Sequence, residues 1–201
     1  LVARWREPQV LNLWPEGDRQ LQEIIASLEQ IASRDAIRVG RTWIEANVAA
    51  AHAIAGNISK KILYLPSCAH RLHILFLLHD ILQTEVQKME PVRPLATAFK
   101  PFLVWMLRPS YQLAQSTAPN GEESGKVLKL LDLWTERGIL TPKETREVRV
   151  IITAKDLPGV SGAQLHGGVQ HSPAPSLMQQ VGAQISAQQA AAARAPPVPP
   201  P

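Results

Sequence analysis

The segment that most constrains this chain is Arg71–Thr84 (RLHILFLLHDILQT), an apolar run that nevertheless contains one carboxylate and two imidazoles. In a helix, residues spaced by three, four and seven positions share a face. Apolar residues then cover most of the circumference, so the helix must be packed on several sides. We expect it at the centre of a domain, with one mixed line facing a groove: His70, His73, Leu77, Asp80 and Thr84. A simpler interpretation is a buried helix in which Asp80 forms a cap or an internal pair.

The first three quarters of the chain have the composition of a helical protein. Ala, Leu, Gln, Glu, Lys and Arg dominate there, and Gly is scarce. Alternating β-branched runs bounded by turn residues do not occur, so no sheet is expected. The prediction is an all-α stack of seven or eight short helices, without a repeat of fixed period.

Capping residues and prolines predict where the helices begin and end. Gly40 inside the second helix is expected to permit close approach of a neighbour. Pro101 should kink or split its helix, and Gly138 suits a left-handed C-terminal position. The first two expected helices are capped by Asp18 and opened by Ser33, and the next three span residues 48–63, 67–88 and 95–107. A short segment from Pro109 and a polar loop over residues 116–125 follow. The last two expected helices are 126–137 and one that begins with a capping box at Thr141 and Glu144.

These elements predict three regions. Residues 1–17 form an extended lead-in whose Trp5 and Trp14 we expect to lie against the domain. Residues 18–155 form the helical domain. Residues 156–201 are a low-complexity Gln/Ala/Pro-rich tail that buries too little apolar surface to order, and we expect a disordered linker. Its terminal prolines also fit a polyproline II ligand for an SH3 or WW domain.

Charge and hydropathy exclude several kinds of protein. The net charge of +4 lies before residue 156 and suits an anionic partner, but it falls short of the dense Lys/Arg patch of nucleic-acid-binding proteins. The apolar run is too short and too charged to cross a bilayer, and no signal peptide opens the chain. Because the sequence begins at Leu1, we expect it to be a piece of a longer protein.

No pattern in the chain predicts catalysis or a bound cofactor. Cys68, His70 and His73 could start a metal site, but a structural zinc site needs four ligands and no further Cys/His pair exists. His79 and Asp80 are adjacent, so on a helix they diverge by roughly 100°, and no nucleophile accompanies them. We therefore expect no enzyme activity, no catalytic residue, no cofactor and no metal.

A second cluster of interest lies on the helix predicted over residues 126–137. Lys126 and Lys129 are three residues apart and point together, away from the apolar stripe of that helix. They could add positive charge to the groove of the central helix. Alternatively, they simply solvate an exposed helix face.

Two runs of the sequence carry a resemblance to a known family: Leu72 to Leu82 (LHILFLLHDIL) and Lys129 to Gly138 (KLLDLWTERG). Together they resemble the CTD-interacting domain. This helical module binds the C-terminal repeat tail of RNA polymerase II. The first run is similar to the family pattern L-x-L-L-Y-L-x-N-D-V-L, and the second to R-L-L-x-L-W-E. The resemblance covers roughly residues 18 to 155. Residues Ser33–Trp43 also resemble the start of this domain in the calcium homeostasis endoplasmic reticulum protein family.

The resemblance implies a right-handed superhelix of about eight helices, similar to ENTH and VHS domains. A phosphorylated heptad peptide would dock between the central and penultimate helices. The family's Asn-Asp pair, which binds the peptide tyrosine hydroxyl, maps to His79 and Asp80, and its phosphoserine-binding arginine maps to Lys129. The predicted peptide-binding residues are His73, Leu77, His79, Asp80, Thr84, Lys126 and Lys129.

Three positions depart from the family pattern. His79 replaces the usual Asn or Asp, which leaves Asp80 to accept the tyrosine hydroxyl alone, and Phe76 replaces a Tyr. Lys129 is a point charge where Arg would bind phosphate through two parallel hydrogen bonds. These changes predict weaker or less phosphate-selective binding, or its loss with the fold retained.

The resemblance thus implies a nuclear, non-enzymatic domain that binds phosphorylated RNA polymerase II C-terminal repeats and links transcription to pre-mRNA splicing or processing. Splicing factors are further expected partners, RNA contact is left to other parts of the protein, and no membrane partner is expected. Two alternatives stay open. One is an ENTH- or VHS-type membrane-trafficking adaptor, and the other is a structural scaffold domain in a spliceosomal complex.

Overall fold

A computed structural model of the chain describes residues 5, 8–118 and 120–155. Eight α-helices and three short 3-10 helices make up this part of the chain, with no strand, so the all-α prediction is confirmed. The predicted tail, 156–201, lies outside the described residues. The helices are α1 (Pro15–Gln30), α2 (Arg34–Ala46), α3 (Ala51–Lys61), α4 (Cys68–Gln87), α5 (Pro94–Phe99), α6 (Leu103–Thr117), α7 (Glu122–Glu136) and α8 (Pro142–Thr153), with 3-10 helices η2 (Val48–Ala50), η3 (Ile62–Tyr64) and η4 (Lys100–Phe102).

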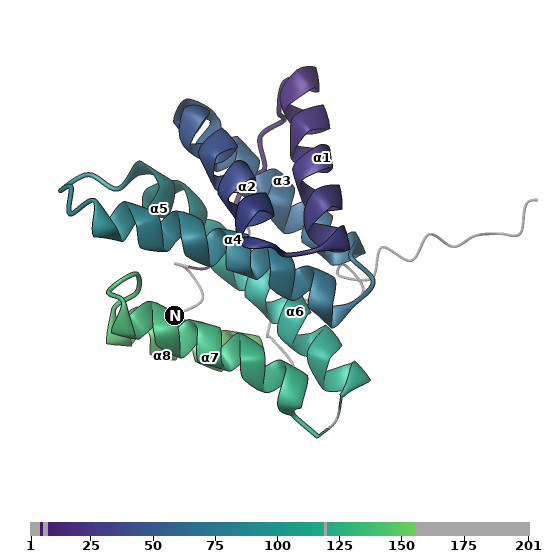
Figure 1. Cartoon of the computed structure of the whole chain (residues 1–201). Coiled ribbons are helices and arrows are strands. Elements are labelled where there is room, and N and C mark those ends of the chain that lie inside the picture. Colours follow the sequence, from purple (N-terminus) through teal and green to yellow (C-terminus); the bar gives the residue numbers. More distant parts are fainter. Residues whose placement is uncertain (1–4, 6–7, 119, 156–201) are drawn as a thin grey trace, which may run out of the picture. The chain divides into compact units, whose positions relative to one another are not determined.

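Helix α4 lies in the middle of the domain, as its apolar sequence predicts. Figure 1 shows α1 and α2 on one side of α4, α7 and α8 on the other, and α6 behind it. Leu75, Leu78 and Ile81 are almost completely buried. Each such side chain contributes about 1.5–3 kcal/mol by leaving water, which is why α4 anchors the fold.

Local capping signals fix several helix ends as predicted. The Ser33 hydroxyl accepts a hydrogen bond from the Ala36 amide at 3.1 Å at the start of α2. Thr141 and Glu144 form the predicted capping box at the start of α8. Gly138 has a φ of 69°, a left-handed conformation that glycine adopts without strain.

Three boundaries differ from the prediction. Helix α1 begins at Pro15 rather than after Asp18, because proline suits the first helical position. Helix α7 begins at Glu122, inside the expected polar loop, with Asn120 accepting the Glu122 amide at 3.2 Å. Pro109 does not start a new segment but lies inside α6. Buried residues on both sides of it (Met106, Leu107 and Ala114) offset the backbone hydrogen bond that proline removes.

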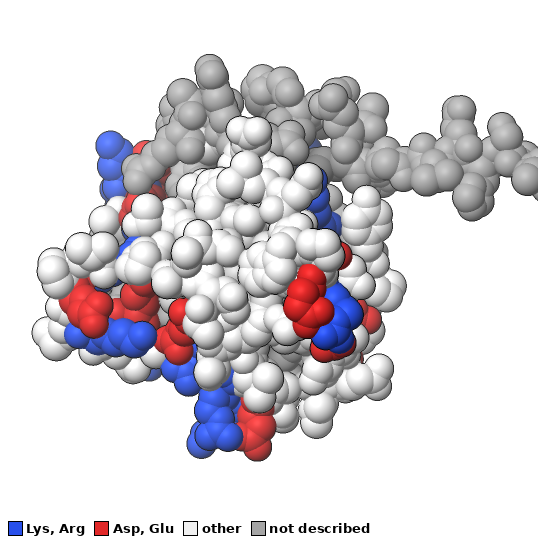
Figure 2. Space-filling model, turned by 90° about the horizontal axis from the view of Figure 1, so that it is seen from above, with Lys and Arg blue, Asp and Glu red and all other residues white. Residues whose placement is uncertain are grey.

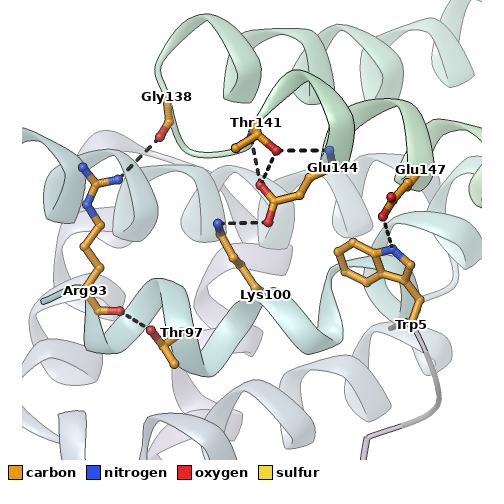
Figure 3. A network of polar contacts seen from close by, with 8 residues as sticks. All are labelled: Trp5, Arg93, Thr97, Lys100, Gly138, Thr141, Glu144 and Glu147. Carbon is orange, nitrogen blue, oxygen red and sulfur yellow. Dashed lines mark hydrogen bonds and ion pairs between the residues drawn. The ribbon is translucent and has the colours of Figure 1, made fainter. Parts of the chain in front are cut away.

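Polar contacts tie the lead-in and the α5–η4 segment to α8 (Figure 3). The Lys100 ammonium lies 3.3 Å from the buried carboxylate of Glu144, and Pro101 separates α5 from α6 as predicted. The Trp5 indole N–H donates to Glu147 at 3.4 Å, and its ring is buried. Trp14 stacks on Trp43 with ring centroids 6.3 Å apart. Both tryptophans of the lead-in therefore lie against the domain, as expected.

Within the described part of the chain, no helix combines the length and the apolar character that a membrane span requires.

Candidate functional site

The line of α4 that was predicted to face a groove instead faces α1 and α2. The His73 Nδ1 lies 2.7 Å from the Leu28 carbonyl of α1 and donates to it. Leu77 is only 1% exposed, so its predicted place in the groove is wrong. The reason is the close approach of α2: a Cβ at Gly40 would lie 3.1 Å from the Leu77 side chain. Gly40 therefore permits the close contact predicted for it.

The solvent-facing line of α4 shares Asp80 with the predicted line and otherwise lies beside it. We call it the α4 strip; it consists of Phe76, His79, Asp80 and Gln83, which share a face at helical spacing. The Phe76 side chain is 41% exposed and the Asp80 side chain 39% exposed, whereas both neighbouring leucines of Phe76 are buried. An exposed aromatic ring beside polar groups on a rigid central helix is typical of a binding surface.

Arg41 of α2 borders the α4 strip and pairs with it. Its Nε lies 2.9 Å from Asp80 Oδ2, and its Nη1 donates to the Thr84 hydroxyl at 3.0 Å. Asp80 thus has an internal partner, as in the simpler of the two interpretations of α4, although its carboxylate still reaches solvent. The Thr84 hydroxyl accepts a hydrogen bond from the same guanidinium, and Thr84 is only partly exposed.

His79 connects the α4 strip to α7. The Trp134 indole N–H donates to His79 Nδ1 at 3.2 Å, and Trp134 is completely buried. Burial lowers the pKa of His79; Asp80 acts in the opposite sense and Arg137 adds to the lowering. The ring is therefore neutral at pH 7, because its pKa starts from about 6.5 and moves down.

Helix α7, on the other side of α4 from α2, carries further cations. A hydrogen bond to Glu123, at 2.5 Å, raises the pKa of Lys126, burial opposes this, and Cys68 in the first turn of α4 adds to the increase. Lys126 is therefore coupled electrostatically to the start of α4, and Arg137 to His79. The two helices run in the same direction, as Figure 1 shows.

Lys129 lies on the outer face of α7. The residue one turn later on that face, Asp132, pairs with Arg149 of α8, whereas Lys126, one turn earlier, pairs with Glu123. Lys129 lies between these two directions and is exposed, and no described residue forms an ion pair or hydrogen bond with it.

Asp80 and Lys129 lie on adjacent helices, α4 and α7. Because Trp134 bonds to His79, Lys129 and Asp80 are offset by about 9 Å along the two helix axes. Packed helices lie 8–10 Å apart, so the total separation is roughly 13 Å, about four extended residues. The structure thus places both side chains toward solvent on adjacent helices.

Several charges elsewhere on the domain form ion pairs. On the face seen in Figure 2, a broad uncharged area is bordered by Lys and Arg side chains that lie against Asp and Glu. Such pairs include Arg38 with Asp35 in α2, at 2.8 Å, and Lys61 of α3 with Asp18 of α1, at 3.1 Å. Among the described residues seen on this face, Lys and Arg do not gather in a dense patch of the kind that binds nucleic acid.

No group of three or more potential metal ligands occurs among the residues that the structure describes. Cys68 Sγ lies 3.0 Å from the Thr117 hydroxyl instead.

Sequence reasoning missed Arg41, Arg137 and the exposure of Phe76. Arg41 meets Thr84 across 43 positions, and no local pattern signals such a contact. Arg137 lies inside the motif that ends at Gly138, so that motif did contain a usable signal.

Comparison with known families matches residues 19–148, more than half of the chain, to the family described as the CID domain. The matched span contains the α4 strip together with Arg41, Lys129 and Arg137. No curated protein and no solved structure matches the chain.

Proposed function

The chain belongs to the CID domain family, a family of protein-interaction domains directed at polymerase C-terminal repeats, and we propose that its α4 strip binds phosphorylated repeats of RNA polymerase II. The observation that carries this proposal is the placement of cations on both sides of the strip. Arg41 of α2 pairs with Asp80 of the strip, Arg137 at the end of α7 acts on the charge of His79, and α7 also exposes Lys126 and Lys129. A phosphoserine carries close to two negative charges and three acceptor oxygens, which such cations attract.

Each part of the surface has a role in this proposal. Phe76 offers an exposed ring against which an aromatic or proline residue of the peptide can pack. Lys129, the free cation at the position where the family has its phosphate-binding arginine, receives the phosphoserine. Because lysine is a flexible point charge, we expect modest affinity and modest discrimination between phosphorylated and unphosphorylated peptide.

Membership of the family also supports a proposal for the wider role. We propose a nuclear protein that links transcription to pre-mRNA splicing or processing, with splicing factors as further partners bound through other surfaces. The α4 strip then serves as the contact with the transcribing polymerase, and no enzymatic step is involved.

Calorimetric titration of the 201-residue chain tests the proposal. A two-repeat tail peptide, with and without phosphoserine, is the ligand. We expect the phosphorylated form to bind about three- to tenfold more tightly, and the Lys129→Ala variant to lose most of that difference. Lys60→Ala, which removes an exposed lysine from α3, is the matched control and should leave affinity unchanged. Equal affinity for both peptides, or no binding of either, contradicts the proposal.

A further inference from the structure

Trp134 determines which hydrogen-bonding group His79 can offer to a ligand. An indole N–H is a donor and never an acceptor. Since it points at His79 Nδ1 across 3.2 Å, that nitrogen must carry the lone pair. A neutral imidazole has one proton, so the proton lies on Nε2.

The surroundings make this tautomer stable. Trp134 is completely buried, and its N–H would lose its partner if the ring turned over, which costs about 1–3 kcal/mol. If Nδ1 were protonated, its N–H would point at the Trp134 indole N–H, and two donors would face each other. Burial and the nearby Arg137 both disfavour the imidazolium, although Asp80 favours it.

The remaining nitrogen of His79 is free to interact with a ligand. Nε2 forms no hydrogen bond with any described residue, and it is not among the buried polar atoms that lack a partner. It therefore reaches solvent as a donor. The neighbouring acceptor, Asp80, forms an ion pair with Arg41 through its Oδ2.

We propose that His79 is a specificity-determining residue that donates a hydrogen bond from Nε2 to an acceptor oxygen of the bound peptide, the tyrosine hydroxyl oxygen being the acceptor. This inference rests on the proposed function and deepens it. An Asn or Asp at this position accepts from the tyrosine hydroxyl, whereas His79 reverses the direction of the hydrogen bond. Trp134 is the positioning residue, because it holds the tautomer without touching the peptide.

Peptides with altered tyrosines separate the two directions. In O-methyltyrosine the oxygen accepts but cannot donate, whereas the amino group of 4-aminophenylalanine donates well and accepts poorly. Titration of the whole chain should show the O-methyl peptide within about twofold of the parent and the amino peptide about five- to tenfold weaker. The His79→Asp variant, which can only accept, should reverse this order. Because the added methyl group is equally large in both proteins, the reversal excludes a purely steric effect.

The alternative outcomes are distinct. Loss of O-methyl peptide binding by the unmodified protein, with the amino peptide retained, means that Asp80 or another acceptor receives the hydroxyl and overturns the inference. If neither the parent nor the altered peptides bind, the proposed function fails instead. The ligand-free protein still tests the tautomer in that case: long-range proton–nitrogen NMR should show His79 with an unprotonated Nδ1. A protonated Nδ1 overturns the inference regardless of binding.

Discussion

Arg41 and Asp80 form an ion pair between α2 and α4, with Nε 2.9 Å from Oδ2, at the edge of the exposed α4 strip. The pair neutralises a carboxylate that would otherwise repel a phosphorylated ligand. Its two side chains are 22% and 39% exposed, so solvent screens it and its contribution to stability stays below about 1 kcal/mol. Its main effect should therefore be on binding.

The Arg41→Gln variant tests this effect. Removing the guanidinium leaves the Asp80 charge uncompensated beside the peptide, and phosphopeptide affinity should fall about three- to tenfold. The double variant Arg41→Gln, Asp80→Asn should recover most of the loss, as a double-mutant cycle by calorimetry would show. An affinity loss in the double variant as large as in the single one would mean that Arg41 binds the phosphate directly.

His79 should make the protein less stable in mild acid. Its pKa in the folded state lies below the unfolded value of about 6.5, so as pH falls through that value the unfolded chain binds a proton that the folded chain does not. Stability is then full above about pH 6.5 and declines below it. Because the ring is half-exposed, solvent screening limits the expected loss to about 1 kcal/mol by pH 5.5.

Urea unfolding at pH 7.5 and pH 5.5 measures this loss. The His79→Gln variant, which keeps an acceptor for the Trp134 indole but cannot titrate, is the control for the other histidines. Its stability should fall less between the two pH values than that of the unmodified protein. Identical pH dependence in both proteins would show that His79 titrates normally.

Sequence reasoning recovered the local features of this fold. The caps at Ser33 and Thr141 and the turn at Gly138 depend only on residues close by in the sequence, so the local sequence predicts them. The orientation of α4 could not be read in the same way. Apolar residues surround that helix, and therefore the hydrophobic pattern does not say which polar line meets solvent and which meets α2.

The charged and polar residues of the site were likewise predictable from the sequence only in part. Lys129 was singled out from its motif, and it is exposed. Arg41 and His79 acquire their roles from partners on other helices, Asp80 and Trp134. Such contacts join positions far apart in sequence, and only the packed helices bring them together.

Gly40 should tolerate no large side chain. A Cβ there would lie 3.0 Å from Ile24 and 3.1 Å from Leu77, so Gly40→Leu must push α2 away from α1 and α4. We expect a loss of about 1–3 kcal/mol or more in the free energy of unfolding. Denaturant unfolding is the measurement.

Gly125→Ala is the opposite case and the matched control. Gly125 also lies within a helix, α7, but a Cβ there meets nothing within 4 Å. Alanine should therefore stabilise the protein by about 0.5–1 kcal/mol through its higher helix propensity. Equal effects of the two substitutions would contradict the close packing at Gly40.

Glu85 fixes the start of α5 from within α4. Its carboxylate is only 5% exposed and accepts the Leu95 amide at 2.8 Å and the Ala96 amide at 2.7 Å. The N-cap residue of α5, Arg93, provides no side-chain cap of its own. In the Glu85→Gln variant one acceptor becomes an NH₂ group that faces a backbone N–H, which should cost about 1–3 kcal/mol. Glu90→Gln, the same chemical change at an exposed loop position, should shift the urea midpoint little. If both variants unfold at the same urea concentration, the carboxylate does not hold α5 in place.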